Sequence, residues 1–347
     1  MGRATDSTRN KLGMLGMKRR YWIQATLGLA LGVMVGCAPE DGGGSGTAAA
    51  YPTKTITLVC PWAPGGGTDR VSRFLADQLE KKLGKPVVVQ NKTGGGGAVG
   101  HSAGATARPD GHTLLMGTFE LSTMHWMGIS KLTYANYQPL MQVNADAAAI
   151  FVKADSEFSD IRSFLDHIKA NPGKVQMSGT ATGGAWDLAR SGLLLAADIP
   201  VEAVRWVPTQ GAAPSLVQLM GGHIDAVCCS VPEAAPQVEA GELKALAVMA
   251  AERLPEYPEV PTVKEAGVEW EAVGWRGLLL PKETPQEIVD VLSQTVGEIV
   301  ASEEYQAFME KNGFGVVTKA PAEFGEFLKK EDAQWETVIK AAGFARE

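Results

Sequence analysis

The chain has 347 residues, and its formal net charge is −7 at pH 7. This acidic balance disfavours binding to nucleic acid or to an anionic membrane surface. The 5 histidines and 4 cysteines show no metal-ligand spacing, so we expect neither a metal site nor a cofactor.

Residues 1–37 have the pattern of a secretory signal. The basic run Lys18-Arg19-Arg20 precedes an apolar stretch at 25–35, which is too short to span a bilayer. A small residue stands directly before Cys37. We therefore expect a lipoprotein signal, with Cys37 acylated and forming the mature N-terminus. An ordinary signal that is cleaved elsewhere is the alternative.

Two further features of this region leave alternatives open. The pair Arg19-Arg20 is compatible with twin-arginine export as well as general secretion. Translation can start at Met1 or at Met17, since a normal signal begins at Met17.

Residues 38–50 are rich in glycine, alanine and serine, and we expect them to form a flexible tether. Removal of residues 1–37 takes away six basic residues and one acidic residue, which leaves a net charge of −12. The roughly 300 residues that follow are more than a single core usually holds, so we expect two domains.

Short β-rich runs alternate with segments of helical periodicity, which predicts an α/β fold with a mostly parallel sheet. The predicted strands are 55–60, 86–90, 112–117, 147–153, 174–179, 201–208, 224–230, 244–250 and 271–281. The predicted helices are 71–84, a segment that starts after 94–97, 161–170, 186–197, 214–221 and three tail segments from residue 288 onward.

Polar or glycine-rich segments follow several of these strands. Ligands of such sheets lie beyond the carboxyl ends of the strands, so each segment is a candidate site. The segments are 64–69, 91–97, 118–120, 180–186, 209–211 and 230–232. Most contain Gly, Thr or Ser, which supply backbone and hydroxyl donors for a carboxylate or a similar anion.

The first of these segments lies in "PWAPGGGTDR" (61–70), which matches neither a P-loop nor a dinucleotide-binding fingerprint. Glycines at the start of a helix expose N–H groups to an anion. We predict that Gly65, Gly66, Gly67 and Thr68 bind one carboxylate, and that a side chain at Gly66 blocks it. We expect Asp69 to cap the helix or to contact a ligand hydroxyl. A plain turn capped by Thr68 or Asp69 is the alternative.

The segment Gly100-His101-Ser102-Ala103-Gly104 matches the G-x-S-x-G nucleophile elbow. That elbow needs a buried strand directly before the serine, whereas here four glycines and "AV" precede the segment. We therefore expect Ser102 in a short helix and no enzymatic activity, with a serine hydrolase as the alternative.

Three cysteines remain after Cys37: Cys60, Cys228 and Cys229. An odd number gives no disulfide framework, and neighbouring cysteines rarely pair with each other. We expect Cys228 and Cys229 to pack as buried residues.

Several segments from Tyr51 onward match, in order, the motifs of one protein family. They are "YPTKTITLVCPWAPGGGTDRVSRFLADQLEKKLGKPVVVQNKTGGGGAVG", "ARPDGHTLLMGT", "ANPGKVQMSG", "VPTQGAAPSLVQLMGGHIDA", "AGELKALAVMA" and "YPEVPTVKEAG". The chain thereby resembles the tripartite tricarboxylate transporter solute receptors, also called Bug-type binding proteins.

The resemblance implies a type II periplasmic binding protein with a ligand cleft between two α/β domains that crossover strands join. Domain 1 is expected to comprise 51–149 and 274–347, and domain 2 to comprise 150–273. The receptor is expected to be a monomer that captures a small carboxylate and delivers it to a two-part membrane permease. It is expected in the periplasm or at the cell surface. A sensor that signals to a membrane kinase is the alternative.

The strand ends and the resemblance together give a set of candidate ligand-binding residues. They are Pro64, Gly65, Gly66, Gly67, Thr68, Asp69, Thr118, Thr180, Thr182, Gly183, Trp186, Thr209, Gly211, Ser230 and Arg276. Trp186 and Trp275 are core aromatics in the alternative interpretation.

Four departures from the family pattern lie around the expected ligand, so the resemblance does not imply which carboxylate is bound. Asp187 stands where the family often has His, and Thr209-Gln210 replace a common Tyr-Lys pair. Cys229-Ser230 replace an Asp-Asn pair. Arg276 stands at an often aromatic position, where it either clamps a second carboxylate or faces solvent.

Overall fold

A computed structural model describes residues 51–346. The predicted signal, its Cys37 and the predicted tether lie outside the described residues. Within 51–346, none of the helices has the length and apolar character needed to cross a membrane.

The N-terminal elements follow the predicted order. They are β1 (Ile56–Cys60), α1 (Gly67–Leu83), β2 (Val87–Asn91), α2 (Ala98–Ala105) and β3 (Thr113–Thr118). A 3₁₀ turn, Phe119–Ser122, follows β3 directly. Helix α1 ends at Leu83, and its C-cap Gly84 has a φ of +65°, the left-handed conformation that favours glycine.

The remaining elements alternate between strands and helices up to a helical tail. They are β4 (Tyr137–Lys153), α3 (Ile161–Ala170), β5 (Val175–Ser178), α4 (Ala185–Ala196), β6 (Val204–Trp206), α5 (Ala212–Met220), β7 (Ala226–Ser230), α6 (Val231–Glu239), β8 (Leu243–Val248), β9 (Val273–Pro281), α7 (Gln286–Val300), α8 (Glu303–Lys311) and α9 (Pro321–Ala341).

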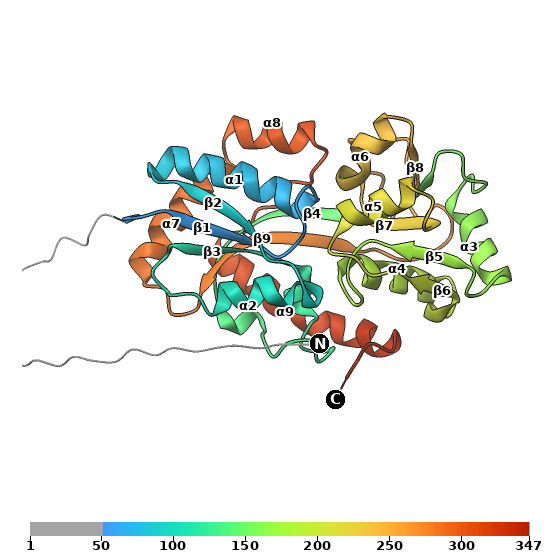
Figure 1. The fold of residues 1–347 in the computed structure, drawn as a ribbon, viewed down its shortest axis with the longest axis horizontal. Coiled ribbons are helices and arrows are strands. Elements are labelled where there is room, and N and C mark those ends of the chain that lie inside the picture. The colour runs from blue at the N-terminus through green and yellow to red at the C-terminus, as the bar shows by residue number, and fades with distance from the viewer. Residues whose placement is uncertain (1–50, 347) are drawn as a thin grey trace, which may run out of the picture. The chain divides into compact units, whose positions relative to one another are not determined.

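The strands lie in the order β2-β1-β3-β9-β4-β7-β5-β6, with β8 paired to β4. Pairs within β1–β3 and within β5–β7 are parallel, whereas every pair that includes β4 or β9 is antiparallel. The prediction of a mostly parallel sheet is therefore wrong. The physical reason is that β4 and β9 run antiparallel to each other through the middle of the molecule (Figure 1).

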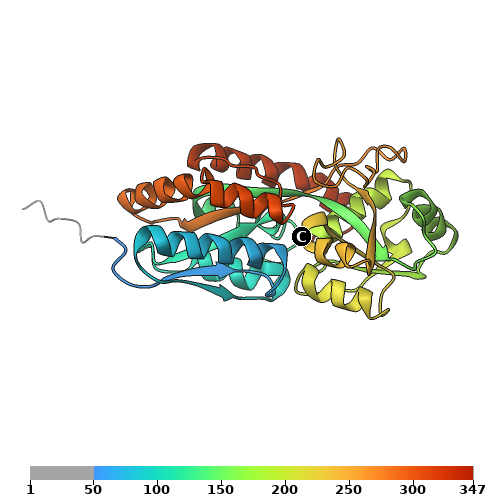
Figure 2. The same cartoon turned by 90° about the horizontal axis from the view of Figure 1, so that it is seen from above.

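Strands β4 and β9 join two α/β lobes. We call β1–β3, α1, α2, α7, α8 and the 3₁₀ turn after β3 the first lobe, and α3–α6 with β5–β8 the second lobe. The two lobes lie side by side in both views, with β4 and β9 between them (Figures 1 and 2). The predicted boundary at residues 149 and 150 falls inside β4, and the one at 273 and 274 falls at the start of β9. These boundaries stay predictions.

Three local predictions differ from the structure. Strand β4 begins at Tyr137, ten residues before the predicted strand. Residues 201–203 form a 3₁₀ turn before the short strand β6. Helix α6 was not predicted. Pro232 stands in its first turn, where a missing N–H costs little, and Pro236 stands inside the helix.

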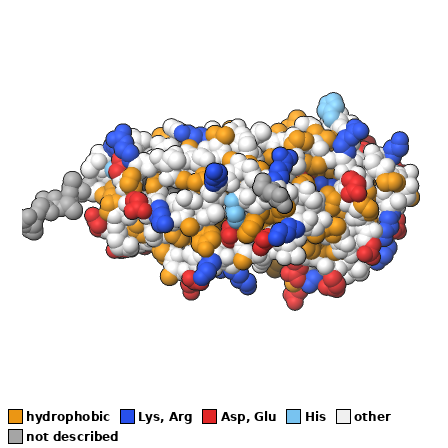
Figure 3. All heavy atoms as spheres, turned by 90° about the horizontal axis from the view of Figure 1, so that it is seen from below, with side chains coloured by type: hydrophobic (Ala, Val, Ile, Leu, Met, Phe, Trp, Pro, Cys, Tyr) orange, Lys and Arg blue, Asp and Glu red, His pale blue; other side chains and the backbone are white. Residues whose placement is uncertain are grey.

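The surface carries both signs of charge. On the face in Figure 3, acidic and basic side chains are interspersed among apolar ones. The net negative charge therefore does not make this face uniformly acidic.

Candidate ligand-binding site

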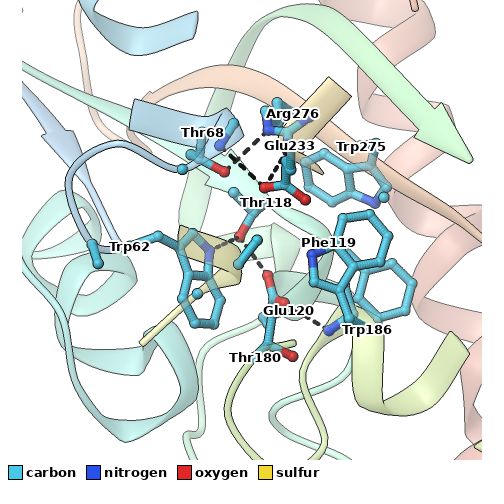
Figure 4. Close-up of a pocket in the computed structure, with 17 residues that line it drawn as sticks. Trp62, Thr68, Thr118, Phe119, Glu120, Thr180, Trp186, Glu233, Trp275 and Arg276 are labelled. Carbon is cyan, nitrogen blue, oxygen red and sulfur yellow. Dashed lines mark hydrogen bonds and ion pairs between the residues drawn. The ribbon is translucent and has the colours of Figure 1, made fainter. Parts of the chain in front are cut away.

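A pocket lies between the two lobes, where the glycine turn before α1 and the end of β3 face the starts of α4, α5 and α6 (Figure 4). Strand β9 supplies a further wall. The lining residues are Trp62, Ala63, Gly66, Gly67, Thr68, Thr118, Phe119, Glu120, Thr180, Ala185, Trp186, Gly211, Ala212, Glu233, Gly274, Trp275 and Arg276.

Eight of the predicted residues line this pocket: Gly66, Gly67, Thr68, Thr118, Thr180, Trp186, Gly211 and Arg276. The others lie outside its lining: Pro64, Gly65, Asp69, Thr182, Gly183, Thr209 and Ser230. Among these, Pro64, Gly65 and Thr182 are exposed. The hydroxyl of Thr209 donates to the carbonyl of Gly211, so this side chain stabilises its own loop.

The turn before α1 has a defined backbone geometry. Gly65 has a φ of +85° and Gly66 is the extended N-cap, so α1 begins at Gly67 rather than near Asp69. The backbone N–H of Gly65 donates to Asp69 Oδ2 at 2.9 Å. The alternative that Thr68 or Asp69 is the N-cap is therefore wrong. Asp69 instead folds back onto the turn that precedes its helix.

Hydrogen bonds hold Asp69 in its ionised form. Burial alone would raise the pKa of this carboxyl, but hydrogen bonds from Arg73, Gly65 and Asn91 lower the pKa below its usual value. Arg73 Nε donates to Oδ2 at 2.9 Å and Asn91 Nδ2 donates to Oδ1 at 2.8 Å. The protein itself thus supplies three hydrogen bonds to the carboxylate of Asp69.

Gly67, rather than Gly66, is the position with no room for a side chain. A Cβ at Gly66 would meet no atom closer than the carbonyl of Ala63 at 3.7 Å, and Gly66 does not have positive φ. A Cβ at Gly67 would lie 2.7 Å from Arg276 Nη2 and 2.9 Å from Glu233. A side chain at Gly66 would therefore not strain the backbone, and the prediction that it blocks a bound carboxylate stays a prediction.

The turn before α4 repeats the geometry of the turn before α1. Gly183 has a φ of +72°, and Gly184 is an extended N-cap. The N–H of Gly183 donates to Asp187 Oδ2 at 2.9 Å, as that of Gly65 does to Asp69. Burial raises the pKa of Asp187, which pairs with the equally buried Arg190. We call these two segments, 65–69 and 183–187, the α1 turn and the α4 turn.

Each turn donates its first helical N–H to a glutamate of the other lobe. The N–H of Gly67 donates to Glu233 Oε1 at 3.1 Å, and that of Ala185 donates to Glu120 Oε1 at 2.8 Å. Glu233 lies on α6 of the second lobe, and Glu120 lies in the first lobe after β3. Two carboxylates therefore occupy the two helix N-termini, where the helix dipole favours negative charge.

Arg276 is buried beside the α1 turn and does not face solvent. Its Nε donates to Thr68 Oγ1 at 3.0 Å and its Nη1 donates to Asp146 Oδ2 at 2.5 Å. Nη2 lies 3.5 Å from Glu233 Oε1 (Figure 4). Burial alone would lower the pKa of the guanidinium, but Asp146 and Glu233 raise it above the usual value.

Thr118 and His101 support the second glutamate. Thr118 Oγ1 donates to Glu120 Oε2 at 2.5 Å, and complete burial raises the pKa of Glu120 above its usual value. His101 Nδ1 lies 2.8 Å from the carbonyl of Gly97, and the N–H of Thr118 donates to His101 Nε2. Burial lowers the pKa of His101 to about 4, so this imidazole is neutral at pH 7.

Four aromatic side chains complete the lining: Trp62, Phe119, Trp186 and Trp275. All four are almost wholly buried. Trp62 Nε1 donates to Thr118 Oγ1 at 3.2 Å, which fixes that ring at the pocket wall. Trp186 and Trp275 thus line the pocket and also belong to the hydrophobic core.

Ser102 lies inside the short helix α2, as expected, and not on a strand-to-helix elbow. Cys60, Cys228 and Cys229 are buried and have free thiols. Burial raises the pKa of the Cys60 thiol to about 11, which disfavours its reactive thiolate. We assign no chemistry to these groups.

Glu233 was not predicted from the sequence, and Glu120 was included only as part of the candidate segment 118–120. A signal for Glu233 is present in Ser230-Val231-Pro232-Glu233, which has the S-x-x-E spacing of a capping box. In the structure, the hydroxyl and N–H of Ser230 donate to Glu233 Oε2. This capping box holds Glu233 so that its other carboxylate oxygen, Oε1, lies at the α1 turn.

Two α/β lobes, two crossover strands and a pocket between the lobes define a two-domain α/β solute-binding protein. The family model described as "Tripartite tricarboxylate transporter family receptor" matches residues 71–344, and the chain belongs to this family. The expectation of an α/β periplasmic-binding-protein fold, which came from the resemblance, is confirmed.

Three solved structures of at least 26% identity illustrate this relationship. The periplasmic binding protein BugD is 29% identical, with a TM-score of 0.81 over 86% of this chain and 100% of that chain. MatC from Rhodopseudomonas palustris with bound malate is 26% identical, with a TM-score of 0.77 over 83% and 100%. A further R. palustris protein with adipate is 27% identical, with a TM-score of 0.80 over 85% and 99%.

Proposed function

We propose that this chain is a periplasmic or cell-surface receptor that captures a small carboxylate in the pocket and delivers it to a tripartite tricarboxylate-type permease. Membership of the receptor family supports this proposal. Similar structures that contain malate and adipate support the carboxylate as the ligand class.

One observation carries the proposal for this chain. The N–H of Gly67 donates to a carboxylate oxygen of Glu233, and Arg276 lies 3.5 Å from the same oxygen. The side-chain carboxylate of Glu233 therefore stands in for the carboxylate of a ligand at the start of α1. Hydrogen bonds to such charged acceptors each contribute ~1.5–3 kcal/mol.

The proposed carboxylate site consists of Gly66, Gly67 and Thr68, with Arg276 beside it. Thr118, Thr180, Trp186 and Gly211 are proposed to contact the rest of the ligand, because they line the same pocket. Asp69 is proposed to hold the α1 turn, since its carboxylate already accepts three hydrogen bonds. The lobes are proposed to act as the two domains, 51–149 with 274–347 and 150–273, of a monomer.

A screen of carboxylates tests the proposal. Malate, succinate, adipate and citrate would be added to the purified protein in a thermal-shift assay, with the uncharged diamides of succinate and adipate as controls. A ligand that binds only the folded state must raise the melting temperature. We expect at least one carboxylate, and neither diamide, to raise it by several degrees. No shift with any carboxylate would contradict the proposal.

Membrane anchoring through Cys37 is a separate part of the proposal. We expect the wild-type protein to fractionate with membranes and Cys37→Ser to be released as a soluble protein or to remain unprocessed. Membrane association that is unchanged in the variant would contradict acylation at this cysteine.

A further inference from the structure

Arg70 joins the two lobes at a point outside the pocket lining. It lies in the first turn of α1, and its Nη1 donates to the carbonyl of Pro232, at the start of α6, at 3.0 Å. Neither residue is among the described residues that line the pocket. Helix α1 belongs to the first lobe and α6 to the second, and the start of α1 faces α6 across the boundary between the lobes (Figures 1 and 2). This hydrogen bond therefore forms only while the lobes are in contact.

The carbonyl of Pro232 is available to Arg70 because of a second proline. In a regular α-helix each carbonyl accepts from the N–H four residues further on. Four residues after Pro232 stands Pro236, which lies inside α6 and has no N–H to donate. Pro232 is buried, and a buried carbonyl that lacks a hydrogen-bond donor is costly. Arg70 thus supplies, from the other lobe, the donor that α6 does not have.

The guanidinium of Arg70 is also fixed by its own lobe. Its Nη2 donates to Asn312 Oδ1, and its Cζ lies 5.0 Å from the centre of the Phe314 ring. Both residues follow α8 in the first lobe. Because these contacts already orient the planar guanidinium, little side-chain freedom remains to be lost when it binds the carbonyl of Pro232.

The lobes also meet inside the pocket, but a ligand competes for part of that contact. The N–H of Ala63 donates to the carbonyl of Gln210 at 3.0 Å, and the N–H of Gly67 donates to Glu233 Oε1 at 3.1 Å. The second of these bonds lies where the ligand carboxylate is proposed to bind. The bond from Arg70 lies outside the lining, so a ligand in the pocket does not displace it.

We infer that Arg70 is a positioning residue that holds the two lobes closed, and that Pro236 leaves the carbonyl of Pro232 available for it. We call Arg70, Pro232 and Pro236 the Arg70 latch. The latch stabilises the closed arrangement with and without ligand, because none of its three residues lines the pocket. A ligand between the lobes leaves when they separate, so the latch also slows ligand release. This last effect rests on the proposed function, whereas the closure of the lobes does not.

Small-angle X-ray scattering of the full chain, with no carboxylate added, tests the latch. Arg70→Met keeps an unbranched side chain beside Phe314 but removes the hydrogen-bond donors. We expect this variant to have a larger radius of gyration than the wild type and an unchanged circular dichroism spectrum. Lys82→Gln is the matched control, because it removes a positive charge from the same helix and its partner Glu298 belongs to the same lobe. We expect the radius of gyration of this control to equal that of the wild type.

Pro236→Ala tests the role of the second proline. Pro236 is exposed, and alanine at this position supplies an N–H that competes with Arg70 for the carbonyl of Pro232. Replacing a proline inside a helix also favours the helix. We therefore expect Pro236→Ala to melt at the same temperature as the wild type or higher, and yet to have a larger radius of gyration. A general loss of stability does not produce this combination.

Ligand release is measured by stopped flow with the tightest carboxylate of the screen. We expect the dissociation rate to rise at least ~fivefold in Arg70→Met, because a charged hydrogen bond between the lobes is lost, and less than ~twofold in Lys82→Gln. Arg70→Lys keeps one charged donor and should recover part of the difference.

The scattering result and the ligand screen fail independently of each other. An unchanged radius of gyration in a folded Arg70→Met overturns the latch and leaves the carboxylate receptor intact. If Arg70→Met does not fold, an unchanged radius in Pro236→Ala overturns it. A larger radius with an unchanged dissociation rate contradicts the effect on release. If no carboxylate binds, the proposed function is contradicted and the scattering comparison alone decides the latch.

Discussion

The α1 turn and the α4 turn share the spacing G-G-x-x-D, the positive φ at the first glycine and the hydrogen bond from that glycine to the aspartate. They differ at the first helical residue, which is Gly67 in one and Ala185 in the other. They also differ in the partner of the aspartate: Arg73 is half exposed, whereas Arg190 is buried. Both turns thus hold a carboxylate at their first helical N–H, but the aspartate of the α4 turn belongs to a fully buried ion pair and that of the α1 turn does not.

The largest effect is expected at the first helical residue of the α1 turn. In Gly67→Val, the added side chain would overlap Arg276 and Glu233, which lie within 2.9 Å of an added Cβ. We expect a loss of at least ~100-fold in affinity, or ~2.7 kcal/mol, for the tightest carboxylate of the screen. Calorimetric titration measures this loss.

Gly66→Ala is the matched control for that variant, because an added Cβ meets nothing closer than 3.7 Å. Gly66 lines the pocket, so we expect some loss of affinity, but a smaller loss than in Gly67→Val because the added methyl group clashes with no protein atom. Equal losses in both variants would show that the turn is sensitive to any side chain, and the distinction between Gly66 and Gly67 would be lost.

The two aspartates are expected to differ in their contribution to stability. Asp187→Asn leaves the buried Arg190 without its counter-ion, and breaking a buried pair costs about 3 kcal/mol or more. Asp69→Asn weakens a pair with the half-exposed Arg73, which contributes about 1 kcal/mol or less. Urea unfolding of both variants measures the difference. A larger loss of unfolding free energy in Asp69→Asn than in Asp187→Asn would contradict the conclusion that the ion pair of the α4 turn contributes more to stability.

His101 accepts the N–H of Thr118, and the hydroxyl of Thr118 donates to Glu120, which binds the α4 turn. We expect His101 to make the free energy of unfolding depend on pH. Its pKa is lowered to about 4 when folded, against ~6.5 when unfolded, so the unfolded chain takes up the proton first as the pH falls. The stabilisation that comes from keeping His101 neutral is complete above pH ~6.5 and is lost between pH ~6.5 and pH ~4. We expect the free energy of unfolding to fall by about 2 kcal/mol between pH 7 and pH 5 from this group.

Two variants assign that pH dependence. His101→Gln should lose this part of it, and the exposed His223→Gln should keep it. The measurement is urea unfolding at a series of pH values. An unchanged pH profile in His101→Gln would mean that other groups cause the loss of stability in acid.

The smallest effect is expected at Ser102, which lies in α2 and belongs to neither turn. Ser102→Ala should change stability and ligand affinity by less than about 0.5 kcal/mol. The wild-type protein should not hydrolyse p-nitrophenyl esters. Ester hydrolysis that disappears in Ser102→Ala would favour the hydrolase alternative.

The order of the elements and the α1 turn could be predicted because both depend on local signals. Apolar runs bounded by glycine and proline predicted β1, β2 and β3, and the residues at 64–69 predicted a helix start. Strand β4 was predicted only in its second half. Its first half contains Pro139, Asn144 and Asp146, which do not read as a strand although Asn144 and Asp146 are buried against Arg276.

The partners of the two turns could not be predicted in the same way. Glu233 is 166 residues from Gly67, and Glu120 is 65 residues from Ala185. Such contacts arise from the way in which β4 and β9 place the lobes, and no local pattern specifies them. Arg276 was recognised as unusual, but its burial and its pairing with Asp146 depend on the same long-range arrangement.

A crystal structure of the protein with the tightest carboxylate of the screen tests the central claim most directly. The account predicts a ligand carboxylate within hydrogen-bond distance of the Gly67 N–H, with Glu233 Oε1 displaced from it and Glu233 Oε2 still on Ser230. A ligand bound elsewhere, with Glu233 unmoved at Gly67, would contradict the assignment of the α1 turn as the carboxylate site.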